Sequence, residues 1–214
     1  IWFGVMYKKK PFFIVFEGVE GCGKSYQSKR LKKNLIKKNI HPVLTREPGG
    51  TKSAELIRNL ILKDYFNKKT KEKFDKYTDT LLYLAARNEH VKNKIRPALL
   101  KKKIVICDRF TDSTIAYQVY GKKVDFKFIN NIHKKILSGI KPNIVFILKV
   151  SKNSSKKRLK KRKTKNRYDN FAQSFYTKAQ RSFLNIAKNK KNYYILDSSS
   201  NDKLVEKKIF TIVN

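Results

Sequence analysis

The residues best placed to do chemistry form the octapeptide Gly18-Val19-Glu20-Gly21-Cys22-Gly23-Lys24-Ser25, which matches the pattern G-x-x-x-x-G-K-[ST]. Glycines at these positions let successive backbone N–H groups turn toward phosphate oxygens, and a following helix adds the partial positive charge of its N-terminus. Lys24 should then reach the β- and γ-phosphates of a nucleoside triphosphate, and the Ser25 hydroxyl should ligate Mg²⁺. The octapeptide therefore predicts a phosphate-binding loop.

Such a loop works only between a strand and a helix, and the flanking residues predict both. Residues 12–16 form a short apolar run with the aromatic and β-branched content of a buried strand. On the other side, Leu31, Leu35 and Ile36 are spaced as on one face of a helix. The context that the motif requires is thus present in the sequence.

The rest of the chain repeats the alternation of apolar runs and helical periodicity. Further strands are predicted at residues 43–45, 104–107, 144–148 and 193–196. Helices are predicted near residues 53–63, 77–100, 125–138, 152–163, 170–190 and 202–212, and we expect Pro97 to bend the second of them. This order predicts an α/β fold of the P-loop NTPase type, with three α/β/α layers around a five-stranded parallel sheet.

No repeat or low-complexity linker divides the sequence, so we predict one domain over residues 1–214. Residues 1–10 should form a loose N-terminal extension, and the charged stretch from Asn67 to Lys76 a surface loop. No apolar run approaches the ~20 residues that span a bilayer, which predicts no membrane partner. The only cysteines, Cys22 and Cys107, favour free thiols and a reducing cytoplasmic location.

Two charged residues follow the third predicted strand, at the sheet edge where parallel folds bind ligands. Asp108 ends that apolar run and stands where a second acidic partner for Mg²⁺ is expected, although a carboxylate that only caps the strand is the alternative. Arg109 offers a planar fork for a phosphate, or else a solvated surface cation.

Residues 156–167 are intensely basic and follow the fourth predicted strand. A helical lid over about residues 152–169 could close these cations over a transferring phosphoryl group. A solvated basic helix end or a nucleic-acid patch is the alternative.

The formal net charge of +36 would attract polyanions, so a nucleic-acid-binding protein that uses ATP as a switch is a second reading. The lysines, however, are spread over the whole chain, and abundant Lys, Asn and Ile are typical of an AT-rich coding sequence. We therefore predict solvated basic faces and no specific nucleic-acid partner.

Several motifs together resemble the thymidylate kinase family, in its bacterial type, over about residues 12–200. The motifs are Glu17–Ser25, Thr45-Arg46-Glu47-Pro48-Gly49-Gly50-Thr51, Leu81-Leu82-Tyr83-Leu84-Ala85-Ala86-Arg87 and the stretch from Asp108 to Gln118. The resemblance implies a homodimeric enzyme that transfers the γ-phosphoryl group of ATP to dTMP, giving dTDP and ADP for dTTP synthesis. A related kinase for another nucleotide or a deoxynucleoside is the nearest alternative.

The resemblance also implies roles for single residues. In the acceptor site, Glu20 would contact the sugar hydroxyl and Arg109 would grip the dTMP phosphate. Around the base, Tyr83 would stack where the family usually has Phe, and Arg87 would donate to a thymine carbonyl. The remaining acceptor contacts would come from Pro48, Arg58, Thr114 and Gln118. Since the loop from Gly18 to Lys24 contains no arginine, the lid must supply the catalytic one, and the candidates are Arg162, Arg167 and Arg158.

Overall fold

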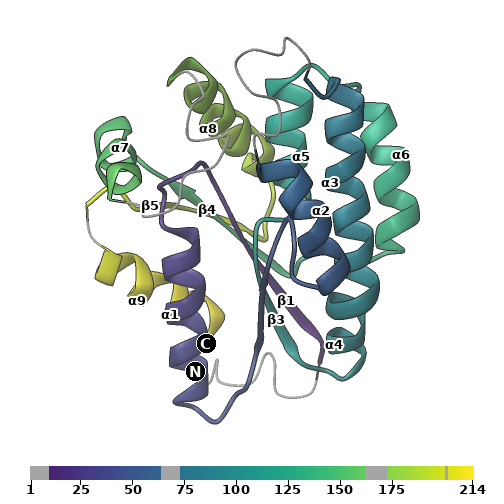
Figure 1. The fold of residues 1–214 in the computed structure, drawn as a ribbon. Coiled ribbons are helices and arrows are strands. Elements are labelled where there is room, and N and C mark those ends of the chain that lie inside the picture. Colours follow the sequence, from purple (N-terminus) through teal and green to yellow (C-terminus); the bar gives the residue numbers. More distant parts are fainter. Residues whose placement is uncertain (1–9, 64–72, 162–172, 201) are drawn as a thin grey trace.

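The protein, described by a computed structural model over residues 10–63, 73–161, 173–200 and 202–214, is built on one sheet (Figure 1). Its five strands are parallel and lie in the order β2-β3-β1-β4-β5. They are β1 (Phe12–Glu17), β2 (Val43–Arg46), β3 (Ile104–Asp108), β4 (Ile144–Lys149) and β5 (Tyr193–Asp197). The predicted five-stranded parallel sheet is confirmed.

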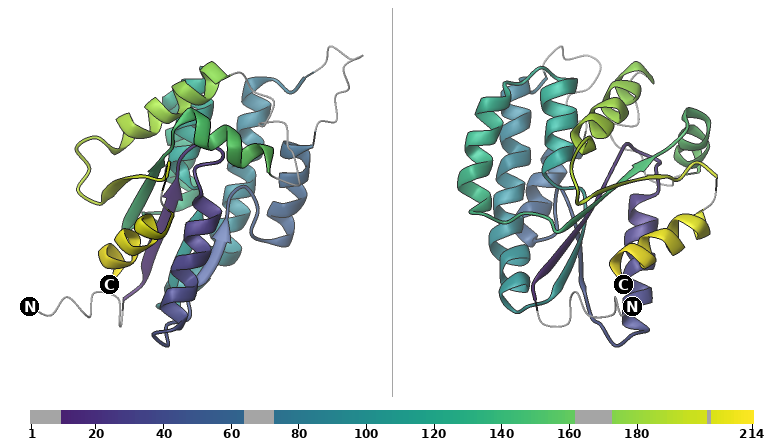
Figure 2. Two further views of the ribbon diagram at one scale, coloured as in Figure 1. Left: turned by 90° about the vertical axis from the view of Figure 1, so that its left-hand side faces the viewer. Right: turned by 180° about the vertical axis from the view of Figure 1, so that it is seen from behind.

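Helices cover both faces of the sheet, which gives the three predicted layers (Figure 2). Helices α1 (Lys24–Ile36) and α9 (Asp202–Val213) pack together on one face. On the other face lie α8 (Gln173–Ala187) and a long helix made of α3 (Lys76–His90), η1 (Val91–Ile95) and α4 (Arg96–Leu100). The remaining helices are α2 (Lys52–Leu62), α5 (Thr111–Thr114), η2 (Ile115–Gly121), α6 (Phe126–Leu137) and α7 (Lys152–Lys160).

The core explains why the strands appear as continuous apolar runs rather than alternating ones. Every residue of β1 and β3 is buried, because helices lie against both sides of the sheet. Between strands, the rings of Phe16 and Phe146 lie 5.2 Å apart at their centroids. A rigid, dry sheet of this kind fixes the loops that follow β1, β2 and β3 at one edge.

Two helical details differ from the sequence-based predictions. Pro97 lies within the first turn of α4, and the irregularity is the wider π-helical turn η1 just before it. Because proline has no N–H and its ring crowds the carbonyl four residues earlier, the chain widens ahead of Pro97. Periodicity also did not predict the helix formed by α5 and η2, where Thr114 and Ile115 are β-branched and disfavour helix. Burial against α8 overrides that preference.

Three predictions concern residues outside the described part of the chain, wholly or in large part. These are the N-terminal extension over residues 1–10, most of the charged loop at residues 67–76, and the lid beyond Lys161.

Candidate functional site

The phosphate loop joins the central strand β1 to helix α1, as the motif requires. Gly18 has a φ of 136°, and a Cβ there would lie 2.6 Å from the carbonyl oxygen of Leu148. Gly23 has a φ of 92° and immediately precedes Lys24, the first residue of α1. Both positions therefore need glycine, since other residues rarely adopt such backbone angles. The loop's backbone N–H groups lie at the N-terminus of a 13-residue helix.

Lys24 is buried against its own loop. Its ammonium group donates to the carbonyl oxygens of Gly18 at 3.0 Å and Val19 at 2.8 Å. These contacts hold the cation at the floor of a cleft, whose volume is about 580 Å³. The cleft opens at the carboxyl ends of β1, β2 and β3, where ligands bind in parallel folds.

Most of the predicted site residues meet in this cleft, although they come from five separate parts of the chain. The described ones that line it are Glu20, Gly21, Gly23, Lys24, Ser25, Pro48, Arg58, Tyr83, Arg87, Asp108, Arg109, Thr114 and Gln118. Gly18, Val19 and Cys22 support the loop from behind, and Val19 and Cys22 are buried. Arg162 and Arg167 lie outside the described residues.

Ser25 and Asp108 meet in the cleft, and the serine hydroxyl donates to the aspartate Oδ2. Asp108 is the last residue of β3 and pairs in register with Phe16 of β1, so the sheet itself sets the distance between carboxylate and loop. The pair supplies two hard oxygen atoms of the kind that Mg²⁺ prefers.

Arg109 is fixed by both its backbone and its side chain. The backbone is left-handed, with a φ of 74°, and its N–H donates to the carbonyl oxygen of Phe16. The guanidinium donates to Glu20 Oε1 at 2.7 Å, and the Tyr117 hydroxyl donates to the other oxygen of that carboxylate, also at 2.7 Å. Burial raises the pKa of Glu20, but the charges of Arg109 and Lys24 outweigh it and hold the pKa below its ordinary value. Glu20 is therefore an anion inside the cleft.

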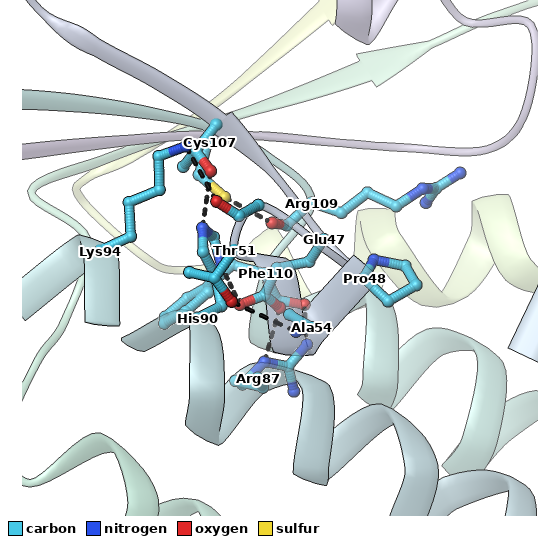
Figure 3. A network of polar contacts seen from close by, with 12 residues as sticks. Glu47, Pro48, Thr51, Ala54, Arg87, His90, Lys94, Cys107, Arg109 and Phe110 are labelled. Carbon is cyan, nitrogen blue, oxygen red and sulfur yellow. Dashed lines mark hydrogen bonds and ion pairs between the residues drawn. The ribbon is translucent and has the colours of Figure 1, made fainter. Parts of the chain in front are cut away.

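Arg87 lies at the centre of a second buried network (Figure 3). Its Nε donates to Glu47 Oε2 at 2.7 Å, and its Nη2 to the carbonyl oxygen of Phe110 at 2.9 Å. The other Glu47 oxygen lies 3.0 Å from His90 Nδ1. Burial raises the pKa of Glu47, but Arg87 and His90 together lower it below the ordinary value. The loop after β2 is thereby bonded to helix α3.

The same guanidinium is also bonded on its far side. Its Nη1 donates to Thr114 Oγ1 at 2.7 Å and lies 2.7 Å from His133 Nε2. Four of its five N–H groups are thus engaged, leaving one Nη2 hydrogen without an acceptor among the described residues. The resemblance implied that Arg87 donates to a thymine carbonyl, and the structure in addition makes its side chain part of the framework of the cleft.

Gln118 contributes a polar group to the wall of the cleft. Its side chain is buried and lines the cleft, and among the described residues its amide Nε2 has no hydrogen-bond partner. Buried donors without partners are rare in proteins because they cost free energy. The cleft therefore contains a buried amide donor whose hydrogen-bonding capacity is unused by the described residues.

Helix α7 closes the cleft from the side of the phosphate loop. The Ser155 hydroxyl donates to the carbonyl oxygen of Glu20 at 2.9 Å. Arg158 donates to the carbonyl oxygens of Gly21 at 3.3 Å and Ser198 at 2.7 Å. The first part of the predicted lid is thus bonded to the loop it should cover.

Comparisons with known proteins agree on one family. The family model described as thymidylate kinase matches residues 16–209. The chain belongs to the thymidylate kinase family. The thymidylate kinase of Pelotomaculum thermopropionicum is 37% identical over 92% of this chain and 89% of its own length. That of the Wolbachia of Brugia malayi is 46% identical over 83% of this chain and 82% of its own length.

A solved structure of a thymidylate kinase also aligns with this chain. The crystal structure of thymidylate kinase from Ehrlichia chaffeensis aligns with a TM-score of 0.74 at 31% identity, covering 96% of this chain and all of that one. Kinases of this family phosphorylate dTMP with ATP, so the membership favours dTMP over the alternative acceptors and an enzyme over a nucleic-acid-binding protein. In the described part of the chain, no helix is long and apolar enough to cross a membrane.

Two residues that line the cleft, Tyr117 and Glu47, and one residue behind it, His133, were not predicted as site residues. Tyr117 lies three positions after Thr114 on the same helix, inside a motif already recognised, so helical spacing could have found it. Glu47 was also inside a recognised motif. His133 gave no such signal, because it reaches Arg87 only through the packing of α6 on α3.

Proposed function

We propose that this family member performs the dTMP kinase reaction in the cleft described above, with ATP on the phosphate loop and dTMP between Arg109 and Arg87. One observation carries the proposal: a single cleft is lined both by the loop lysine and by the buried donors of Arg87 and Gln118. Phosphoryl transfer requires donor and acceptor phosphates to meet in line, and catalysis then comes from positioning and charge.

On the donor side, the N–H groups from Gly18 to Ser25 would bind the ATP phosphates at the N-terminus of α1. Lys24 would then contact the β- and γ-phosphate oxygens and leave the loop carbonyls that it now contacts. Its ammonium compensates the charge that spreads over the transferring oxygens.

The residues around Ser25 fit a magnesium ion. Ser25 and Asp108 present two oxygens to the cleft, and no cluster of three or more His, Cys, Asp and Glu side chains occurs among the described residues. That donor set suits Mg²⁺, which is commonly held by one or two protein oxygens together with water and substrate phosphates. When bound, the ion would neutralise charge on the transferring phosphates.

On the acceptor side, Arg109 would hold the dTMP phosphate and Glu20 the sugar hydroxyl, since the two side chains already form a fixed pair in the cleft. Tyr83 would stack on the thymine ring, and Pro48 and Arg58 would line the pocket beside it. The base edge would meet Arg87, Thr114 and Gln118.

The lid would span about residues 152–169 and bring a cation over the transferring group. Its first half, α7, is bonded to the loop through Ser155 and Arg158. Arg162 and Arg167 are the proposed catalytic arginines.

We also propose a cytoplasmic homodimer of single-domain subunits, assembled through α2 and α3. These helices carry exposed apolar side chains at successive turns: Leu56 and Leu60 on α2, and Leu81 and Ala85 on α3. Apolar residues grouped on neighbouring helices are typical of a protein interface. Sedimentation velocity should give a dimer for the wild-type chain, and a monomer for Leu56→Asp/Leu81→Asp.

The experiment that tests the activity is ADP release with Mg·ATP and one acceptor at a time: dTMP, dUMP, dCMP, dGMP, AMP or thymidine. We expect strong turnover with dTMP, weaker turnover with dUMP and negligible turnover with the rest. Equal or absent turnover with all six acceptors would contradict the proposal.

A further inference from the structure

Helix α6 is not part of the cleft, yet one of its side chains touches the base pocket from behind. His133 is buried, with 7% of its surface exposed, and its Nε2 lies 2.7 Å from Arg87 Nη1. His133 does not line the cleft. Its helix, α6, packs against α3, as Figure 1 shows.

The contact with Arg87 allows only one protonation state of the His133 ring. A guanidinium has five donors and no acceptor, so His133 Nε2 must present its lone pair, and the ring proton must sit on Nδ1. The imidazole is therefore neutral. Its surroundings agree with this, because burial and the neighbouring charge of Arg87 lower the pKa of His133 to about 3. His133 Nε2 consequently remains a hydrogen-bond acceptor at every pH at which the enzyme would work.

The contact also decides which hydrogens are left for a ligand. One Nη1 hydrogen goes to His133 and the other to Thr114 Oγ1, which fixes the guanidinium in its plane. Because Thr114 Oγ1 accepts that bond, its own hydrogen is available to be donated. The base pocket therefore holds three donors: the remaining Nη2 hydrogen of Arg87, the Thr114 hydroxyl and the unpaired amide of Gln118.

A pocket edge made of donors favours a base with a carbonyl at that position and disfavours one with an amino group. We propose that His133 is a positioning residue for base selection, which orients Arg87 and Thr114 so that both present donors to a pyrimidine carbonyl. This inference rests on the proposed role of Arg87 at the base edge. Without the His133 acceptor, the guanidinium can rotate toward Glu47 and away from the ligand.

The test compares variants of position 133 that keep or remove the hydrogen-bond acceptor facing Arg87. His133→Gln keeps an acceptor near the position of Nε2, His133→Leu removes it at similar volume, and His133→Asn is polar but too short to reach. His133→Asn also serves if the leucine variant does not fold. Ile129→Val, one turn earlier on α6 and buried, loosens packing without touching Arg87 and is the matched control.

We expect His133→Leu and His133→Asn to raise the KM for dTMP about tenfold, as for the loss of a hydrogen bond to a charged group. The KM for ATP should stay within about twofold, and the preference for dTMP over dCMP in kcat/KM should fall. His133→Gln should recover most of both properties, and Ile129→Val should change neither.

The inference is overturned if His133→Leu and His133→Gln behave alike, if the KM for ATP rises equally, or if Ile129→Val has the same effect. Arg87→Lys separates this inference from the proposal beneath it. If Arg87→Lys leaves the KM for dTMP unchanged, the base-edge role of Arg87 fails and the inference with it. If Arg87→Lys raises that KM but the His133 variants do not, only the inference fails.

Discussion

The two halves of the cleft are built in different ways. On the side proposed to bind the phosphoryl donor, Lys24 is held by carbonyl oxygens only five and six residues away in the sequence. On the side proposed to bind the phosphoryl acceptor, Arg87 is held by Glu47, Phe110, Thr114 and His133, which lie 23 to 46 residues away. One half is a local backbone structure, and the other is a network of side chains from four separate segments.

This difference predicts how each half responds to damage. A triphosphate-binding loop depends on backbone conformation, so changing one of its side chains should affect chemistry more than folding. In a buried charge network, a side-chain change should affect folding as well, because removing one member leaves another charge buried without its partner. The acceptor half should therefore couple substrate binding to stability, and the donor half should not.

The largest effect should come from Arg87→Ala. Among the described residues, Glu47 would keep only His90 as a side-chain partner for its buried charge. We expect the free energy of unfolding to fall by about 3–5 kcal/mol. Urea unfolding followed by circular dichroism measures this. Adding Glu47→Gln should restore part of the loss, and an unchanged midpoint in the single variant would show that the network does not stabilise the fold.

On the donor side, Lys24→Met should lower kcat by about 10²–10³-fold, because a preorganised donor to the transferring phosphoryl group is lost. The unfolding midpoint should shift far less than in Arg87→Ala. Lys33→Met, exposed on the same helix, is the control and should keep wild-type kcat. Equal losses of stability in Lys24→Met and Arg87→Ala would remove the contrast between the two halves.

Between the halves, Glu17 accepts hydrogen bonds from the Phe110 N–H and the Ser113 hydroxyl, next to Arg109. Burial, followed by the charge of Asp112, raises the pKa of Glu17 from 4.5 to about 8. The folded protein thus retains a proton that the unfolded chain releases above about pH 4.5. The contribution of Glu17 to the free energy of unfolding should therefore fall as the pH rises from about 4.5 to about 8, by at most about 1.4 kcal/mol per pH unit.

Glu17→Gln mimics the protonated carboxyl, so its denaturant midpoint should vary less between pH 5 and pH 8 than that of the wild type. Glu206→Gln is the control, because the pKa of Glu206 is lowered through its hydrogen bond with Arg30 and it does not titrate in that range. Parallel curves for wild type and Glu17→Gln would refute a protonated Glu17.

The smallest effect should come from Tyr83→Phe in the acceptor half. Phenylalanine keeps the aromatic face for stacking, so the KM for dTMP should change by no more than about twofold. Steady-state assays with saturating ATP give this value. A tenfold rise would instead assign the tyrosine hydroxyl a bond to the substrate.

Patterns that are local in the sequence predicted local structure well. The phosphate loop, its flanking strand and helix and the five parallel strands followed from glycine spacing and apolar runs. Two features were not predicted. Pro97 was expected to bend its helix, but the helix accommodates the proline by widening the turn before it. The helix through Thr114 forms because burial against α8 outweighs the local preference of its β-branched residues.

By itself, the sequence determined the proposed phosphate-binding loop, since the loop's chemistry is carried by consecutive backbone groups and one lysine. Only the tertiary structure decided how the side chains of the proposed base pocket are held. The partners of Arg87 meet through the packing of α6 on α3 and the register of β2 with β3, and no spacing along the chain records those contacts.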